Sequence, residues 1–261
     1  MKISVITPTY NSEQTIEDTL KSVCDQEFKN FEHIIVDNES SDNTLKIVDK
    51  YKRKSNLMVI SEKDNGLYHA MNKGVKLASG DIIGIINSDD FYSSREVFSL
   101  ISDIFNLKND VQGVYGDLVY ISKKNKDKIV RYWRSGEFKE KKLKYGWIMP
   151  HPTVFLRRDV YNSFDKPFRE DLSLAADYEF LLRLLKIRKI NFFYIKEVLV
   201  KMREGGLSNS SLKQRIEGWK QLKKSWQINN FKIPKFFIFR RVFAKLGQLF
   251  FVYLFVLKMF L

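Results

Sequence analysis

Short polar segments rich in carboxylates and amides follow four apolar runs in the first 90 residues. They are residues 7–11 (TPTYN), 37–39 (DNE), 62–66 (EKDNG) and 87–90 (NSDD). Carboxylates brought to one place repel each other unless a cation or hydrogen-bond donors lie among them. A divalent cation, together with the donor groups of a ribose or a base, would meet that requirement. The residue types therefore predict a site for a metal ion and a nucleotide.

The apolar runs before these segments have the composition of buried strands. Residues 3–6, 34–36, 57–60 and 82–86 are rich in branched side chains, as expected for strands covered on both faces. Helical spacing of apolar residues predicts three helices between them, around Ile16 to Val23, around Leu45 to Tyr51, and over residues 67–78. This alternation predicts an α/β fold with a parallel sheet. Ligands of such sheets bind beyond the carboxyl ends of the strands, where the polar segments are expected.

The second half of the chain has a less regular pattern. Residues 111–121 and 129–133 are predicted to pair as strands across the lysine-rich turn 123–128, and residues 153–157 form another strand. Residues 177–189 and 208–227 have the spacing of helices. No linker rich in Gly, Ser or Pro divides the chain before Pro234. We therefore expect one domain over residues 1–211 and a C-terminal appendage over residues 212–261.

Several classes of protein lack their sequence signatures here. The first strand is not followed by G-x-G-x-x-G, which disfavours a hydride-transfer dinucleotide fold, and the absence of G-x-x-x-x-G-K-[ST] excludes P-loop chemistry. One cysteine, Cys24, excludes a disulfide scaffold and a Cys-ligated zinc site. Three histidines leave little room for a His-rich metal centre.

The net charge of +14 at pH 7 is unevenly distributed. Residues 1–122 carry a net charge of −6, residues 123–147 of +7 and residues 212–261 of +10. A nucleic-acid binder is expected to present its basic residues across the whole fold, so we expect no nucleic-acid partner. A basic, non-enzymatic protein that binds membranes or nucleic acids stays an alternative, but it gives the acidic segments of residues 1–90 no role.

Taken in order, the motifs resemble those of family 2 glycosyltransferases. The resemblance is carried by residues 5–11 (VITPTYN), Asp37, residues 64–74 (DNGLYHAMNKG), and residues 79–81 (SGD) leading to 87–90. It continues more loosely through residues 151–152 (HP), 175–177 (AAD) and 205–208 (GGLS). Within the family, the motifs are most similar to those of bacterial colanic-acid-type transferases. It implies the GT-A fold and an enzyme that moves a sugar from a nucleotide-sugar donor, expected to be a UDP-sugar, to a hydroxyl of a glycan or lipid-linked acceptor, with inversion. Residues 1–92 would then bind the donor and residues 93–211 the acceptor.

The resemblance also implies which residues hold the donor. The turn with Thr7, Pro8, Tyr10 and Asn11 would grip the nucleoside together with Asp37. Asp64 would face the same pocket, and Asn72 on the following helix would shape it. From the residues alone, Asp37 at a strand end is also suited to capping a helix or turn.

Asn87, Ser88 and Asp89 occupy the place of the family's D-x-D motif. The resemblance implies that Asp89 binds Mn²⁺ or Mg²⁺ with the donor diphosphate, and it leaves the role of Asp90 open. Asn87 departs from the pattern, because the first carboxylate of the motif is missing. His69 departs too, since the nearest group often has Asp there.

On the acceptor side, the resemblance aligns Asp177 with the carboxylate that deprotonates the acceptor hydroxyl. An Asp at a helix start is also favoured by the helix dipole alone.

Arg203 is expected to reach a phosphate. Gly205 and Gly206 are expected to let residues 203–208 close over the donor and exclude water. His151 is equally suited to a site or to a structural hydrogen bond.

The competing enzyme is a nucleotidyltransferase that makes an NDP-sugar. It also places acidic metal ligands on a doubly wound sheet. It would need a glycine-rich, basic signature after the first strand, and residues 7–12 lack one.

The C-terminal residues 212–261 combine basic and apolar side chains. The uncharged run 246–257 would span about 18 Å as a helix, against a hydrocarbon thickness of about 30 Å, and residues 242–261 would span it marginally. We expect this appendage to lie on or dip into an anionic membrane surface, with a helix packed on the enzyme or on a second subunit as the alternative. Since no signal peptide is visible, the expected location is the cytoplasmic face of the membrane. The resemblance implies a polyprenyl-diphosphate-linked acceptor. The basic segment 123–147 is expected either to bind this acceptor or to form a hairpin exposed to solvent.

Overall fold

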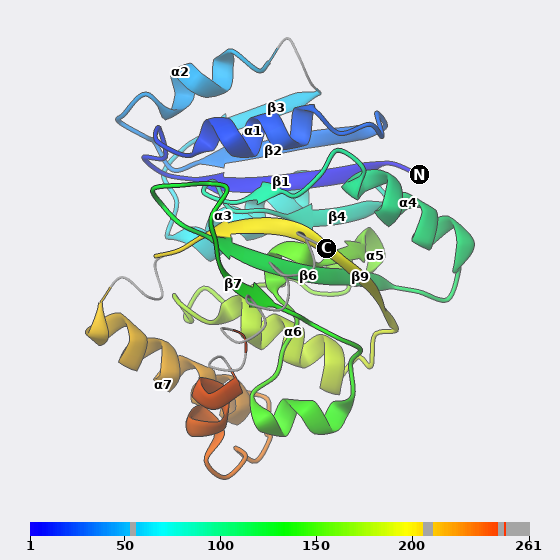
Figure 1. Ribbon diagram of the computed structural model, residues 1–261, viewed down its shortest axis with the longest axis vertical. Helices are drawn as coiled ribbons and strands as arrows, with labels where there is room; N and C mark the ends of the chain where they lie inside the picture. Colours follow the sequence, from blue (N-terminus) through cyan, green and yellow to red (C-terminus); the bar gives the residue numbers. More distant parts are fainter. Residues whose placement is uncertain (53–55, 206–210, 245–247, 249–261) are drawn as a thin grey trace.

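The computed structural model describes residues 1–52, 56–205, 211–244 and 248. Its described strands form one sheet in the order β3-β2-β1-β4-β8-β6-β9-β5, with β7 paired to β6 (Figure 1). The strands are β1 (Ile3–Thr9), β2 (Phe31–Asp37), β3 (Leu57–Ser61), β4 (Ile82–Ile85), β5 (Phe91–Tyr92), β6 (Gly113–Ile121), β7 (Ile129–Trp133), β8 (Phe155–Arg157) and β9 (Phe192–Arg203). The helices are α1 (Ile16–Cys24), α2 (Thr44–Asp49), α3 (Leu67–Leu77), α4 (Val97–Leu107), α5 (Arg158–Asn162), α6 (Ala176–Lys186) and α7 (Leu212–Ile228), with 3₁₀ turns η1 (Glu140–Tyr145) and η2 (His151–Thr153).

The parallel half of the sheet confirms the α/β prediction. β1 lies between β2 and β4 and runs parallel to both, and β2 is parallel to β3. In Figure 1, β1 runs leftward from the N-terminus at the right. The register aligns Thr9 with Asp37, and Asp37 with Ser61. Three strand ends therefore lie side by side at one edge, as the sequence predicts.

Both faces of this half are buried. Val5 packs in a cluster with α1 and α4, whereas its neighbour Ile6 packs in the cluster of α3 and α6. Gly74 lets α3 approach closely, since a Cβ there would lie 2.3 Å from Cγ2 of Ile6. The N-terminal end of α3 is thereby fixed near the carboxyl end of β1.

The second half is mixed. β6 and β7 form the predicted antiparallel hairpin, with Leu118 opposite Trp133. β8 begins only at Phe155, because Thr153, the predicted first residue of that strand, is the last residue of η2. The sequence analysis identifies neither α4 nor β9, although β9 joins β6 in a parallel pair and β5 in an antiparallel one.

The described part of the C-terminal region packs on the rest of the molecule. α7 begins at Leu212, later than predicted, and the hydroxyl of Ser211 accepts the amide hydrogen of Gln214 at 3.2 Å. Leu222 and Trp226 of α7 join the same core cluster as α6. A division at residue 211 stays a prediction. Among the residues that the structure describes, none belongs to a helix long and apolar enough to cross a bilayer, and the run 246–257 is not described apart from residue 248.

Candidate active site

A cavity of about 670 Å³ opens where the carboxyl ends of β1 and β4 meet the N-terminal ends of α3 and α6. It brings together many of the predicted site residues, namely Pro8, Tyr10, Asn11, Asn87, Ser88, Asp89, His151 and Asp177. The other described candidates, Thr7, Asp37, Asp64, Asn72, Asp90, Arg203 and Gly205, are not among its lining residues. Gly206 lies outside the described residues.

The turn after β1 is held in place by the loop after β2. Asn11 has a φ of 47°, a left-handed conformation that Asn tolerates. Its amide donates to Oγ of Ser40 at 2.8 Å, and its Oδ1 accepts from the amide of Ser41 at 2.9 Å. Tyr10 projects into the cavity and is 58% exposed. Thr7, by contrast, is buried, with Oγ1 2.9 Å from Nε2 of His33.

Asp37 is completely buried and satisfied by nearby serines. Its carboxylate accepts hydrogen bonds from the amide and hydroxyl of Ser40 at 3.0 and 2.5 Å, and from the hydroxyl of Ser61 at 2.7 Å. Asn38 and Asp42 line the cavity in its place. The sequence analysis did not select these two residues, although Asn38 belongs to the polar segment that it identified.

Asp64 is likewise buried, but protein partners reach one of its oxygens, and Oδ2 has no hydrogen-bond partner among the described residues. Its side chain has no exposed surface, and Oδ1 lies 2.6 Å from Nδ1 of His69 and 2.7 Å from Nζ of Lys73. His69, the departure from the family pattern, thus contacts Asp64. The amide of Asp64 donates to Oδ1 of Asn38 at 2.5 Å, which couples Asp64 to the cavity wall indirectly. Direct contact of Asp37 or Asp64 with a donor stays a prediction.

Asn72 supports a loop behind the cavity. Its Nδ2 donates to the carbonyl oxygen of Phe168 at 2.8 Å, and its Oδ1 accepts from the amide of Phe168 at 2.9 Å. Since the nitrogen and the oxygen of the Asn72 side chain both bind the backbone of Phe168, Asn72 fixes the segment that leads to α6.

The carboxylates after β4 have fewer partners. Asp89 is partly exposed in the cavity, and Asp90 is fully buried behind it. Nδ2 of Asn87 donates to Oδ2 of Asp90 at 3.0 Å, whereas Oδ1 of Asp90 has no hydrogen-bond partner in the part of the chain that the structure describes. Burial raises the pKa of Asp89, and burial together with the charge of Asp89 raises the pKa of Asp90 well above its ordinary value. This pair therefore favours a cation beside it.

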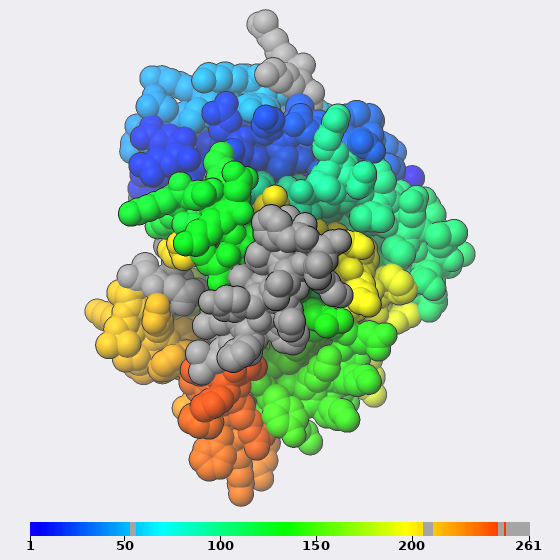
Figure 2. Space-filling model, in the orientation of Figure 1, coloured from blue at the N-terminus to red at the C-terminus, as the bar shows by residue number. Residues whose placement is uncertain are grey.

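Arg203 lies behind Asp89 and does not line the cavity. Its Nη1 donates to the backbone carbonyl of Asp89 at 2.5 Å, and its Nη2 is paired with the carboxylate of Asp18. Asp18 also accepts from Nζ of Lys126 at 2.7 Å, so the tip of the β6–β7 hairpin, green in Figure 2, lies against α1. Arg203 thus positions the backbone that carries Asp89, and its expected contact with a phosphate stays a prediction. Gly205 has a φ of 94°, which favours glycine.

Asp177 lies in the first turn of α6 and lines the cavity. Its Oδ1 accepts a hydrogen bond of 3.0 Å from the hydroxyl of Tyr68, a residue that the sequence analysis quoted within a motif without assigning it a role. His151 is buried nearby and packs edge-on against Phe168. Burial lowers the pKa of His151, and the charge of Asp177 opposes that shift only in part.

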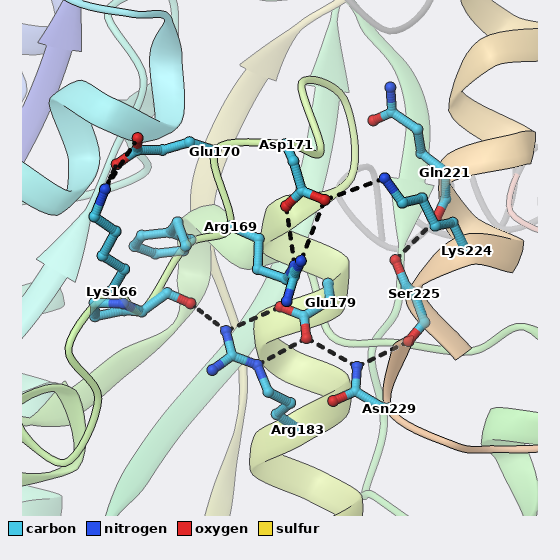
Figure 3. A network of polar contacts seen from close by, with 12 residues as sticks. Lys166, Arg169, Glu170, Asp171, Glu179, Arg183, Gln221, Lys224, Ser225 and Asn229 are labelled. Carbon is cyan, nitrogen blue, oxygen red and sulfur yellow. Dashed lines mark hydrogen bonds and ion pairs between the residues drawn. The ribbon is translucent and has the colours of Figure 1, made fainter. Parts of the chain in front are cut away.

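Helix α7 holds the segment that precedes Asp177. Gln221 accepts from the amide of Leu174 at 2.8 Å and donates to the hydroxyl of Ser173 at 3.1 Å. Nearby, Nζ of Lys224 lies 3.1 Å from Asp171, and Asn229 donates to Glu179 at 2.8 Å (Figure 3). Because Ser173 and Leu174 line the cavity, α7 fixes one of its walls.

Comparison with known proteins identifies the family. The model of glycosyl transferase family 2 matches residues 4–163. The chain belongs to this family. It is 31% identical over 232 residues, 87% of this chain and 84% of the other, to the UDP-Glc:alpha-D-GlcNAc-diphosphoundecaprenol beta-1,3-glucosyltransferase WfgD of Escherichia coli. It is 27% identical over 210 residues, 79% of each chain, to a PGL/p-HBAD biosynthesis glycosyltransferase of Mycobacterium tuberculosis.

Two solved structures support the fold of this family 2 glycosyltransferase. Staphylococcus aureus TarS 1-349 in complex with UDP-GlcNAc gives a TM-score of 0.64 at 24% identity, over 81% of this chain and 61% of that one. The mannosyltransferase PcManGT of Pyrobaculum calidifontis, in complex with GDP-Man and Mn²⁺, gives a TM-score of 0.64 at 19% identity. The match covers 93% of this chain and 69% of that one. The chain therefore has the α/β fold of GT-A transferases and is a glycosyltransferase, as the sequence analysis predicts.

Proposed function

We propose that this enzyme transfers a sugar from a UDP-sugar to a hydroxyl of a glycan or a polyprenyl-diphosphate-linked sugar, with inversion at the anomeric carbon. The observation that carries the proposal is the placement of Asp89 and Asp177 in one cavity. The donor and the lipid-linked acceptor in the name of the E. coli relative support this substrate class.

The donor side of the cavity is suited to a nucleoside diphosphate. The exposed ring of Tyr10 offers a surface for a base, and Asn11 and Asn38 offer polar groups beside it. Asp89 would hold Mn²⁺ or Mg²⁺, which fits a site where Asp90 has an unpartnered buried oxygen. Magnesium in such sites commonly takes one or two carboxylates and completes its shell with phosphates and water. When bound, the ion would stabilise the negative charge of the departing diphosphate.

The acceptor side is suited to proton removal. Asp177 is placed to take the proton of the acceptor hydroxyl as its oxygen attacks the anomeric carbon. The new carbon–oxygen bond forms as the bond to the diphosphate breaks on the opposite side, which inverts the configuration. The nonpolar wall of Leu67, Met71, Leu174 and Met202 helps to keep water from the donor.

A panel of nucleotide sugars tests the proposal. We expect metal-dependent release of UDP from one UDP-sugar in the presence of a lipid-linked or glycan acceptor, and loss of this release in Asp177→Asn. UDP with Mn²⁺ should raise the melting temperature, whereas oligonucleotides should not. Release of pyrophosphate from a nucleoside triphosphate and a sugar phosphate would instead assign the nucleotidyltransferase activity.

The C-terminal region adds a membrane contact to the proposal. Phe236, Phe239 and Phe243 are 75%, 62% and 57% exposed, and we refer to them as the aromatic patch. They lie in the orange to red region at the lower end of Figure 2, which Nη1 of Arg241 ties to the carbonyl of Gly146 at 2.6 Å. Aromatic side chains beside basic ones suit an anionic lipid surface. This contact would hold the enzyme at the inner face of the cytoplasmic membrane.

Vesicle binding tests this contact. The wild type should sediment with vesicles that contain phosphatidylglycerol and not with phosphatidylcholine alone. Changing the aromatic patch to serines should abolish sedimentation, whereas Leu107→Ser, at a position 79% exposed on α4, should not. A patch variant that binds vesicles normally but no longer dimerises would assign the patch to a second copy of the chain.

A further inference from the structure

Tyr68 connects the first turn of α3 to the first turn of α6. Its side chain is 6% exposed, and its hydroxyl donates to Oδ1 of Asp177 across 109 residues of sequence at 3.0 Å. Both residues line the cavity. A hydrogen bond from a buried phenol to a carboxylate in the cavity indicates a role beyond core packing.

The ring of Tyr68 is itself held in place. It stacks on Phe168, with centroids 6.1 Å apart and planes at 21°. The backbone of Phe168 is bound by Asn72, which lies four residues after Tyr68 and so on the same side of α3. Asn72, Phe168 and Tyr68 therefore form a rigid support that ends at Asp177.

We propose that Tyr68 is the positioning residue of the catalytic base: its hydroxyl orients one oxygen of Asp177 and leaves the other to the acceptor, with Asn72 and Phe168 fixing its ring. This inference rests on the proposed role of Asp177. It gives Asn72 an indirect function, through Tyr68, in place of a donor contact.

The electrostatics agree with a donor role for the phenol. Burial and the charge of Asp177 raise the pKa of Tyr68 well above 10, so the hydroxyl keeps its proton. A hydrogen bond donated to a carboxylate favours the ionised form, which is the form that accepts a proton. The other groups around Asp177 are His151 on η2, kept neutral at pH 7 by burial, and uncharged Gln221 of α7 beside the preceding segment. Asp89 lies elsewhere in the cavity wall.

The pH dependence of kcat/KM tests the inference. Tyr68→Phe keeps the ring and removes the hydroxyl, so the acidic limb should move to higher pH by about one unit and kcat at neutral pH should fall about tenfold, with donor KM unchanged. Incorporation of 3-fluorotyrosine at position 68 makes the phenol a stronger donor of nearly the same size. It should move the acidic limb in the opposite direction, to lower pH, and it supplies the test if Tyr68→Phe does not fold.

The matched control is Tyr178→Phe. Tyr178 follows Asp177 directly and is also buried, but its hydroxyl accepts from Nε1 of Trp226 at 2.9 Å. Removing that hydroxyl should lower stability and leave the acidic limb in place. If Asp177→Asn is inactive and neither change at position 68 moves the limb, the inference is overturned while the proposed function stands. If Asp177→Asn retains transfer, the proposed function fails first.

Discussion

Buried carboxylates at the two ends of the parallel sheet differ in their hydrogen-bond partners and in the direction of their pKa shifts. At the amino end, Glu32 accepts hydrogen bonds from Nζ of Lys2 at 2.6 Å, from the hydroxyl of Ser4 at 2.5 Å and from the amide of Ser79 at 2.7 Å. Although burial alone would raise its pKa, these bonds lower it to about 2. At the carboxyl end, Asp90 has one oxygen without a hydrogen-bond partner, and its pKa is raised. Glu32 therefore stabilises the fold, whereas the charge of the carboxyl-end pair opposes folding, an effect that the proposed cation would offset.

The carboxylates at the carboxyl end of the sheet are not all alike. Asp37 lies at that edge too, yet Ser40 and Ser61 satisfy its carboxylate. Asp64 has Lys73 beside its Oδ1 at 2.7 Å, although its Oδ2 has no hydrogen-bond partner among the described residues. Only part of the acidic edge is short of donors in the described structure. A carboxylate at a strand end thus indicates a ligand site when it lacks both a full set of donors and a basic side chain paired with it, and position alone is insufficient.

Replacing a carboxylate should lower the transfer rate at the carboxyl end of the sheet and leave it unchanged at the amino end. Asp89→Asn should lower kcat/KM about 10³-fold, equivalent to about 4 kcal/mol of transition-state stabilisation, because the proposed site loses the charge that holds the metal and diphosphate. Asp81→Asn is the matched control. Asp81 is an exposed carboxylate at the amino end that accepts from the amide of Lys2 at 2.8 Å, and its loss should leave the rate unchanged. Metal-dependent UDP release measures both, and equal rates for Asp89→Asn and wild type would refute the metal assignment.

The next effect concerns stability and its dependence on pH. Glu32→Gln should lower the free energy of unfolding by about 2 kcal/mol at pH 7, since charge-assisted hydrogen bonds to Lys2 and Ser79 are weakened. The folded-state pKa of Glu32 lies below the unfolded value of 4.5, so its contribution is present above pH 4.5 and is lost as the pH falls toward 2. Urea unfolding of both proteins at pH 7, 4.5 and 3 should show the difference shrinking with pH. A constant difference would contradict the role given to Glu32.

The sequence predicts the parallel half well because its signals are local. Branched apolar runs define the strands, and adjacency of their ends follows from parallel pairing, so Asp89 is correctly placed at the edge. The signal for α4 was present in the spacing of Val97, Ile101 and Phe105, all buried on one side of that helix, but it was not recognised. β9 is harder to predict, because irregular register around Asp117 of its partner β6 interrupts the alternation of buried and exposed residues.

Side-chain partners were the least predictable feature of the site. Asp37 accepts one of its hydrogen bonds from Ser61, which lies 24 residues away in the sequence. The hydrogen bond from Tyr68 to Asp177 joins residues 109 positions apart. The partners of Arg203, Asp18 of α1 and the backbone carbonyl of Asp89, are also distant in the sequence. Residue type gives the chemistry available, whereas tertiary packing decides which groups are already used.

The smallest expected effect has the opposite sign to that of Glu32→Gln. Asp90→Asn removes a buried charge and leaves an amide that can still accept from Nδ2 of Asn87, the existing partner at 3.0 Å. The metal-free protein should therefore be more stable by about 1 kcal/mol, which raises the melting temperature by about 2 °C in a chain of this size. The same change should reduce the stabilisation produced by Mn²⁺ with UDP, because one negative charge beside the proposed site is lost. Calorimetry with and without Mn²⁺ and UDP measures both effects. A lower melting temperature in the metal-free variant would mean that Asp90 is satisfied as Glu32 is, and that the two ends of the sheet do not differ.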